Sequence, residues 1–295
     1  MKSSVGFVGL GLMGSPMAVR ILNAGYPLAV YNRTKEKAGD IIQSGAAWCD
    51  SPKEVAERSD IVVSMVSNSA ALEAVALGPS GIMSGLKPGG VHIDTSTVSP
   101  RTTQRLKKEY SERGLFFIHS PVLGSIPQAT DGTLLLFVGG DDKAFDRAEE
   151  IIRIFGSKIW RFPGVEQATH TKLLCNFFIA TMISALTQAL VFSKKAGVEP
   201  RVFLEILNHS ALNSPMYQTK GASIIQRNFT PRFFLEHMLK DINLLVDAAK
   251  DLGVAMPSGQ IAQALFVQAA GLDLDREDYS AVVKILERIG GVEVR

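Results

Sequence analysis

The chain has 295 residues, of which 46% are hydrophobic and 20% are charged, and its formal net charge is +2. This length allows two ordinary domains, each with its own core. The small, dispersed charge argues against a nucleic-acid-binding surface, so small molecules are the expected partners. The two cysteines, Cys49 and Cys175, have no metal-type spacing and make no disulfide framework, which fits a reducing cytoplasm.

A glycine-rich turn near the start of the chain predicts a dinucleotide site. An apolar strand over residues 5–8 leads into Gly9, Gly11 and Gly14 in the pattern G-x-G-x-x-G. The first glycine permits the tight turn, the second lets backbone N–H groups approach a pyrophosphate, and the third lets the following helix pack on the strand. The pattern alone also fits FAD, S-adenosylmethionine or a mere tight turn, but its place between strand and helix favours a dinucleotide.

The end of the second strand predicts which dinucleotide binds. An acidic residue there would bond the 2′-hydroxyl of NAD, whereas this chain has Asn32 and Arg33. A guanidinium makes paired, charge-assisted bonds to a phosphate, so we expect NADP (NADPH) rather than NAD. The residues predicted to bind the cofactor here are Gly9, Leu10, Gly11, Leu12, Met13, Gly14, Asn32, Arg33 and Thr34.

The two halves of the chain have different patterns. The first half alternates β-type runs with amphipathic helices, which predicts a parallel sheet wrapped by helices; the strands are expected at 28–31, 61–65, 91–94, 116–118 and 134–138. Beyond Trp160 the chain reads as helical, with helices expected at about 169–195, 200–208, 231–252, 257–271 and 278–289. The predicted fold is an α/β Rossmann-type doubly wound domain (1–163) followed by an all-α substrate and dimerisation domain (164–295), joined by the long interdomain helix.

The long helix is apolar on nearly all sides, which is typical of a buried helix. Polar residues interrupt its apolar stretch at Thr181, Ser184, Thr187 and Gln188, so we expect no membrane span. No signal peptide is expected either, because the first strand begins almost at once. The apolar helices predict a homodimer or higher homo-oligomer, and the cofactor cleft is expected between the halves.

Lys172 and Asn176 lie four residues apart on this helix and share one face. Two interpretations of the lysine remain open. It could be a surface residue in the first turn whose stem lies across apolar neighbours. It could instead be a general acid/base that protonates an oxygen while a hydride reaches the adjacent carbon, with Asn176 orienting the oxygen or the lysine.

The histidines suggest no further chemistry. The chain has five, and no two of them have tight metal-ligand spacing, so no metal site is expected. His119 is followed by Ser120, but no nucleophile elbow accompanies the pair, and His119 is expected to end a strand.

Four separated motifs together resemble the β-hydroxyacid dehydrogenase family, which includes 3-hydroxyisobutyrate dehydrogenase and glyoxylate/succinic semialdehyde reductase. The matching segments, in family order, are Gly9 to Gly14, the run Asp-Thr-Ser-Thr-Val-Ser-Pro at 94–100, the run Lys-Leu-Leu-Cys-Asn at 172–176, and Lys240-Asp241. The resemblance implies a C-terminal domain like that of 6-phosphogluconate dehydrogenase.

The resemblance also implies roles for particular residues. Lys172 would be the proton donor or acceptor, supported by Asn176. Substrate would be bound by Ser96, Thr97, Gly124, Ser125, Phe233 and Asp241, and cofactor additionally by Val66, Thr97 and Lys240. Without the family resemblance, Ser96 and Thr97 would be interpreted as a strand end and a helix cap. Lys240-Asp241 would be interpreted as an exposed charged turn.

Two departures from the family pattern bear on the substrate. Leu123 stands where a serine is common before Gly124, and Ala168 stands where a glycine is usual four residues before Lys172. One substrate hydrogen bond is therefore missing from the expected set, and Ser125 or Ser120 could replace it. A less polar substrate is equally compatible with this loop.

The expected function is NADPH-dependent reduction of a small aldehyde or semialdehyde acid to the hydroxyacid, reversible as a β-hydroxyacid dehydrogenase. Two alternatives stay open. One is imine reduction on the same scaffold, which Leu123 favours and Lys172 disfavours. The other is a catalytically silent NADPH-binding interaction protein, which retention of Lys172, Asn176 and Asp241 disfavours.

Overall fold

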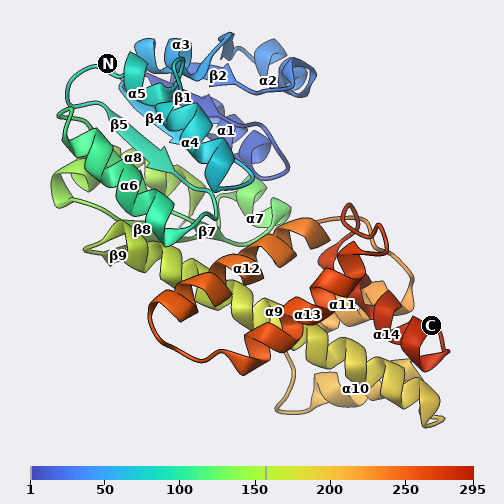
Figure 1. The fold of residues 1–295 in the computed structure, drawn as a ribbon. Helices are drawn as coiled ribbons and strands as arrows, with labels where there is room; N and C mark the ends of the chain where they lie inside the picture. The colour runs from blue at the N-terminus through green and yellow to red at the C-terminus, as the bar shows by residue number, and fades with distance from the viewer. Residues whose placement is uncertain (1, 157) are drawn as a thin grey trace. The chain divides into compact units, whose positions relative to one another are not determined.

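The chain forms two compact units, shown in the computed structural model of Figure 1, which describes residues 2–156 and 158–295. The first unit comprises residues 1–172 and the second residues 173–295. The division falls inside helix α9 (Val165–Lys195), which begins in the first unit and ends in the second.

The first unit is built on one sheet with the strand order β3-β2-β1-β4-β5-β6-β8-β7, in which β9 also pairs with β8. From β3 to β6 all pairs are parallel. The strands are β1 (Val5–Val8), β2 (Leu28–Tyr31), β3 (Ala47–Trp48), β4 (Ile61–Ser64), β5 (Val91–Asp94), β6 (Phe116–His119), β7 (Val122–Leu123), β8 (Leu135–Gly139) and β9 (Lys158–Phe162).

Helices cover both faces of this sheet, because its strand residues alternate between two cores. Phe7 and Val63 face a core that contains Ile21 of α1 and Ile152 of α8. Their strand neighbours face another core with residues of α3, α4 and α6. The helices of this unit are α1 (Gly14–Asn23), η1 (Lys35–Ala38), α2 (Gly39–Gln43), α3 (Pro52–Glu57), α4 (Ser69–Leu77), α5 (Ile82–Gly85), α6 (Pro100–Ser111), α7 (Ile126–Asp131) and α8 (Asp142–Phe155). The doubly wound Rossmann-type domain is thereby confirmed.

The predicted parallel sheet is present from β3 to β6, but one edge of the sheet is mixed. Strand β8 runs antiparallel to both β6 and β7, and β9 then pairs parallel to β8. Strands β3, β7 and β9 were not expected from the sequence. The first two have only two residues each, and β9 is largely exposed, so none of them carries a run of buried apolar residues.

The second unit is helical, as expected. Its core packs Ile183 and Leu190 of α9 against Met238, Ile242 and Phe266 of later helices. These helices are α10 (Pro200–His209), α11 (Pro215–Ile225), α12 (Leu235–Asp251), α13 (Pro257–Ala270), η2 (Tyr279–Val282) and α14 (Val283–Gly290). Helix α11 was not expected; Ser214 caps it by accepting a hydrogen bond from the Tyr217 N–H at 3.1 Å, and Pro215 occupies its first turn.

Helix α9 is long and apolar enough to cross a bilayer, judged by length and composition alone. It has 31 residues, and its most apolar window has a mean hydropathy of 1.7, with 39% of that window buried inside the protein. The hydroxyls of Thr181, Ser184 and Thr187 donate to carbonyls of their own helix, so they do not argue against a span as the sequence suggested. A single such helix is weak evidence, because core helices of globular proteins pass the same test. The absence of a span stays a prediction.

Candidate functional site

The three glycines of the first turn have different surroundings. Gly9 has φ +99°, and a Cβ there would lie 2.2 Å from the Met65 carbonyl oxygen. At Gly14 a Cβ would lie 2.0 Å from the carbonyl oxygen of Gly9, whereas at Gly11 it would meet nothing within 4 Å. Gly9 and Gly14 are therefore required by the turn itself, and Gly11 leaves open space beside the backbone.

Helix α1 begins at this turn with backbone donors that no side chain caps. Its N-cap is Met13, whose side chain accepts no hydrogen bond from the first N–H groups, and its first turn has no acidic residue. Leu10 is buried, whereas Leu12 is exposed. The Ser15 N–H donates to the Gly11 carbonyl at 3.0 Å and Pro16 has no N–H, so an anion at this helix start would be held by N–H groups of the preceding turn and by the helix dipole.

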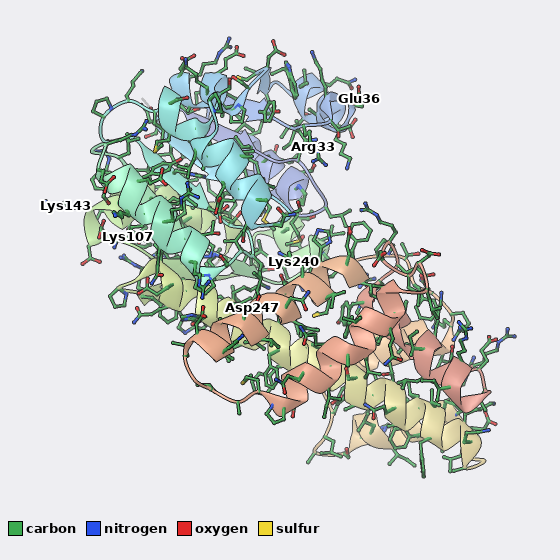
Figure 2. All side chains as sticks on the ribbon, in the orientation of Figure 1. Arg33, Glu36, Lys107, Lys143, Lys240 and Asp247 are labelled. Carbon is green, nitrogen blue, oxygen red and sulfur yellow. The ribbon has the colours of Figure 1, made fainter. Side chains whose placement is uncertain are left out.

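Asn32 joins the turn to the loop after β2. Its Oδ1 accepts a hydrogen bond from the Leu10 N–H at 2.9 Å, and its Nδ2 donates to the Thr34 carbonyl at 2.8 Å. Both ends of the amide are thus engaged within the protein, so Asn32 fixes the shape of the turn. Arg33, by contrast, lies on the surface near Glu36 (Figure 2).

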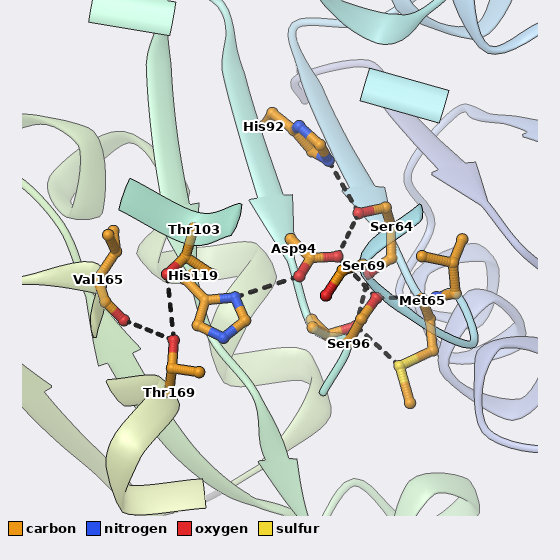
Figure 3. A network of polar contacts seen from close by, with 12 residues as sticks. Ser64, Met65, Ser69, His92, Asp94, Ser96, Thr103, His119, Val165 and Thr169 are labelled. Carbon is orange, nitrogen blue, oxygen red and sulfur yellow. Dashed lines mark hydrogen bonds and ion pairs between the residues drawn. The ribbon is translucent and has the colours of Figure 1, made fainter. Parts of the chain in front are cut away.

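A buried carboxylate links the carboxyl ends of three strands, as Figure 3 shows. Ser64, Asp94 and His119 are the last residues of β4, β5 and β6 and lie in register. Asp94 accepts hydrogen bonds from the Ser64 hydroxyl at 2.7 Å and from His119 Nδ1 at 3.1 Å. Burial alone would raise the pKa of Asp94, but the hydrogen bonds and the neighbouring histidines hold it below its ordinary value.

The same carboxylate fixes residues that the sequence assigns to the ligand sites. Ser96 donates to Asp94 Oδ1 at 2.7 Å and accepts from the Val66 N–H at 2.8 Å. Val66 is also adjacent to Gly9, since a Cβ on that glycine would lie 3.3 Å from Val66 Cγ1. The structure therefore brings together Gly9, Val66 and Ser96 at the carboxyl edge of the sheet, and the half-buried Thr97 follows directly.

His92 completes this network from the opposite side. Its Nε2 lies 2.8 Å from the Ser64 hydroxyl and its Nδ1 lies 2.8 Å from the Tyr110 hydroxyl. Burial lowers the pKa of His92 to about 4, so the ring is neutral near pH 7. Because Ser64 donates to Asp94, it must accept from His92, and Tyr110 must donate to the other ring nitrogen.

The loop expected to contact substrate follows β7. Gly124 has φ +147°, a conformation that side chains other than glycine rarely adopt. The Ser125 N–H is bonded to Gln128 Oε1 at 2.9 Å at the start of α7. Leu123 pairs with Leu135 of β8, and Ser120 is buried.

Lys172 is a buried lysine. Helix α9 begins at Val165, so Lys172 lies two turns inside it, and it is 8% exposed. The interpretation as an exposed lysine in the first turn is therefore wrong. Asn176, one turn further on, is 2% exposed. A buried ammonium is costly unless it has a partner, and Lys172 is not without one.

In the second unit, Asp241 of α12 interacts with two of the other predicted site residues. Asn176 Nδ2 donates to Asp241 Oδ2 at 2.5 Å, and the Lys240 ammonium lies 2.9 Å from Asp241 Oδ1. Asp241 is 2% exposed and lies within α12, which carries Lys240 in Figure 2, so the exposed-turn interpretation is wrong. The amide of Asn176 is thus oriented by a carboxylate.

Phe233 lies just before α12, beside a histidine that the sequence analysis did not select. Its ring centroid lies 6.2 Å from that of His237 and 6.0 Å from that of Tyr279. Burial, followed by the charge of Lys240, lowers the pKa of His237. The signal available in the sequence was the spacing, since His237 is three and four residues before Lys240 and Asp241.

Metal coordination finds no support in the part of the chain that the structure describes. No group of three or more histidine, cysteine, aspartate or glutamate side chains there could hold a metal ion. Burial raises the pKa of the Cys49 thiol to about 11.

Comparison with known proteins matches both units of the chain to dehydrogenase families. Residues 4–164 match the NAD-binding domain of 6-phosphogluconate dehydrogenase, and residues 167–286 match the NAD-binding domain of NADP-dependent 3-hydroxyisobutyrate dehydrogenase. The chain belongs to the β-hydroxyacid dehydrogenase family. It is therefore an oxidoreductase acting on CH–OH groups, with a nicotinamide cofactor.

The alignments with individual relatives cover nearly the whole chain. Glyoxylate/succinic semialdehyde reductase 2 of Arabidopsis thaliana is 32% identical over 96% of this chain and 79% of its own length. The 2-(hydroxymethyl)glutarate dehydrogenase of Eubacterium barkeri is 31% identical over 98% of this chain and 97% of its own. The crystal structure of a 3-hydroxyisobutyrate dehydrogenase from Salmonella typhimurium has a TM-score of 0.88 and 27% identity, covering 96% of this chain and all of that one.

The glycine turn yields a prediction that separates binding from folding. Gly11→Ala should leave the thermal unfolding midpoint unchanged but weaken NADPH binding at least tenfold, because its Cβ would fill the open space needed for close phosphate approach. Gly14→Ala should lower the unfolding midpoint, because its Cβ overlaps a backbone carbonyl. Nucleotide fluorescence titration and thermal melts measure the two effects.

Gly39→Ala is the matched control, since a Cβ there also meets nothing within 4 Å but lies away from the turn, in α2. It should change neither quantity. Equal NADPH affinity in Gly11→Ala and Gly39→Ala would rule out phosphate approach at Gly11.

Proposed function

We propose that this enzyme reduces a small aldehyde or semialdehyde acid to the hydroxyacid with NADPH, and runs reversibly as a β-hydroxyacid dehydrogenase. The observation that carries the proposal is the buried Lys172, one helical turn before an asparagine whose amide is held by Asp241. A buried lysine beside an oriented amide is the arrangement expected of a proton donor with a fixed partner.

The chemistry divides between cofactor and protein. When bound, the reduced nicotinamide supplies a hydride to the carbonyl carbon. Lys172 donates a proton to the carbonyl oxygen in reduction, and in its neutral form it accepts the hydroxyl proton in oxidation. Asn176, held by Asp241, orients the oxygen or the lysine, and Ser96, Thr97, Gly124, Ser125 and Phe233 bind the substrate.

The preference for NADP rests on the segment after β2. Residues 33–37 carry the cations Arg33, Lys35 and Lys37 and one acid, Glu36, and all four side chains are exposed. Lys35 lies over the Trp48 ring at 5.1 Å from its centroid. This net positive, accessible segment suits a 2′-phosphate and would attract rather than repel it.

The relatives favour an acid-bearing carbonyl substrate. Those named above act, by their names, on glyoxylate, succinic semialdehyde or 2-(hydroxymethyl)glutarate. Leu123 lies in the loop that would hold the substrate, so we infer a substrate that needs one side-chain hydrogen bond fewer there. We place the reaction in the cytoplasm, with neither nucleic acid nor membrane as a partner.

Lys172→Met tests the proton donor. Turnover should fall at least a thousandfold over a panel of glyoxylate, succinic semialdehyde, methylmalonate semialdehyde, tartronate semialdehyde and apolar aldehydes, because one general acid is lost. NADPH affinity should survive. Lys195→Met, on the exposed end of the same helix, is the control and should retain full turnover. Turnover near the wild-type rate in Lys172→Met would refute the assignment.

Arg33→Ala tests the choice of cofactor. Losing a charge-assisted pair to the 2′-phosphate should weaken NADPH binding about 10–100-fold, while NADH binding changes little. The exposed Arg113 lies away from this loop, just before β6, and Arg113→Ala should alter neither affinity. If Arg33→Ala weakens NADPH and NADH equally, the arginine does not read the 2′-phosphate.

We also propose a homodimer that uses one face of α9. Phe178, Ala185 and Phe192 are exposed and lie seven residues apart, with the two phenylalanines 62% and 73% exposed. Exposed aromatic side chains in a row are costly in water and typical of an interface with a copy of the chain.

Phe192→Glu should convert a micromolar dimer to a monomer in sedimentation velocity, because it would bury an unpaired carboxylate at one end of the apolar row. The control is Leu252→Glu, at an exposed leucine of the second unit outside this row, and this variant should remain dimeric. A wild-type monomer, or a dimeric Phe192→Glu variant, would count against this interface.

A further inference from the structure

A polar cavity of about 180 Å³ lies within the second unit, and neither Lys172 nor Asn176 is among the residues that line it. One wall comes from α11, with Thr219, Lys220 and Ser223, and the other from the loop before Phe233. Sites for drug-sized ligands occupy about 300–1,000 Å³. This cavity therefore fits a small chemical group and is too small for a dinucleotide.

An ion pair forms the floor of the cavity. Lys220, which is 9% exposed, donates to both oxygens of the 2%-exposed Asp278, at 2.7 and 2.8 Å. The carboxylate also accepts from the N–H and hydroxyl of Ser280 and from the Arg232 N–H at 3.1 Å. Four donor groups make five hydrogen bonds to Asp278, and the Lys220 ammonium opposes its charge, so Asp278 repels an anion less than a lone carboxylate would.

Arg232 supplies a positive charge that this pair does not neutralise. Its backbone is fixed by Asp278, and its exposed guanidinium has no ion-pair partner among residues 2–156 and 158–295. Three other cations of the second unit are paired: Arg227 with Glu287 at 2.6 Å, Arg276 with Glu236 at 2.8 Å, and Lys284 with Glu277. The cavity thus has two cations and one saturated carboxylate.

The remaining groups can both donate and accept. Asn228 Oδ1 accepts from the Thr230 N–H at 3.1 Å, which leaves its amide nitrogen as a donor. The hydroxyls of Thr219 and Ser223 donate to carbonyls of their own helix at 2.9 and 3.0 Å, so they present lone pairs. A guanidinium, amide donors and hydroxyl acceptors together match a partly protonated phosphate oxyanion.

We infer that this cavity is a phosphate-binding site, filled by inorganic phosphate or by the phosphate group of a small phosphomonoester. Arg232 makes the paired contact, and Lys220 contributes its charge from the floor. The residues that line the cavity all belong to the second unit, and none of them is among the residues assigned to the cofactor.

The site also adjoins a predicted substrate residue through the chain. The loop that forms its wall continues directly into Phe233, whose carbonyl accepts from the Tyr279 N–H at 3.0 Å, beside Asp278. A bound phosphate would hold this loop through Arg232 and Asn228. We therefore expect the ligand to order the segment that carries Phe233.

Hydrogen exchange with inorganic phosphate and with glycerol phosphate, at constant ionic strength against chloride, tests the site on the full chain. Both ligands should protect residues 219–234, and any binding at the glycine turn would be seen separately at residues 9–14. Tighter binding of glycerol phosphate identifies an ester as the ligand, and tighter binding of inorganic phosphate identifies the free ion. No phosphate-dependent protection of 219–234 would overturn the inference.

Arg232→Gln is the decisive variant, with Arg288→Gln as the control at an exposed arginine of α14 outside the cavity. Arg232→Gln should weaken phosphate binding at least about tenfold and leave the unfolding midpoint without phosphate unchanged. Arg288→Gln should bind as the wild type does. Equal binding by both variants would overturn the role of Arg232.

Discussion

The buried carboxylate of Asp94 is the interaction on which the first unit's ligand edge depends. Its charge is tolerated in the interior because hydroxyl and imidazole donors from neighbouring strands surround it. Removing any donor would leave part of that charge unpaired. The strand ends are therefore held in one register. Ser96 accepts a hydrogen bond from the Val66 N–H, so both residues are placed by the sheet rather than by a flexible loop.

The second unit also contains a buried carboxylate with polar partners, but on helices rather than on strands. Asp241 is buried on a helix and held by Asn176 from another helix and by the adjacent Lys240. In both units a buried acid therefore orients a neutral side chain of the candidate site: a serine in one, an asparagine in the other. Such residues support function by fixing geometry, and they need not touch substrate themselves.

The elements that the sequence predicted best are those with buried apolar residues. The strands over 28–31 and 91–94 were predicted with their observed bounds, because their apolar runs are central in the sheet. Strands β3, β7 and β9 were missed because short or exposed pairings leave no apolar pattern. The Asp94 network was also missed, because Ser64 lies 30 positions and His119 lies 25 positions from Asp94, and only the folded sheet sets their register.

The burial of the candidate site residues differs in a way that follows from their proposed tasks. Lys172 and Asn176 are almost fully buried, where water cannot compete for a transferred proton and side chains have little freedom. Arg33 is exposed, so its contribution to folding is small, and exchanging it changes few internal contacts. Cofactor choice can therefore vary at position 33 without disturbing the fold, whereas the acid/base position is tied to the packing of α9.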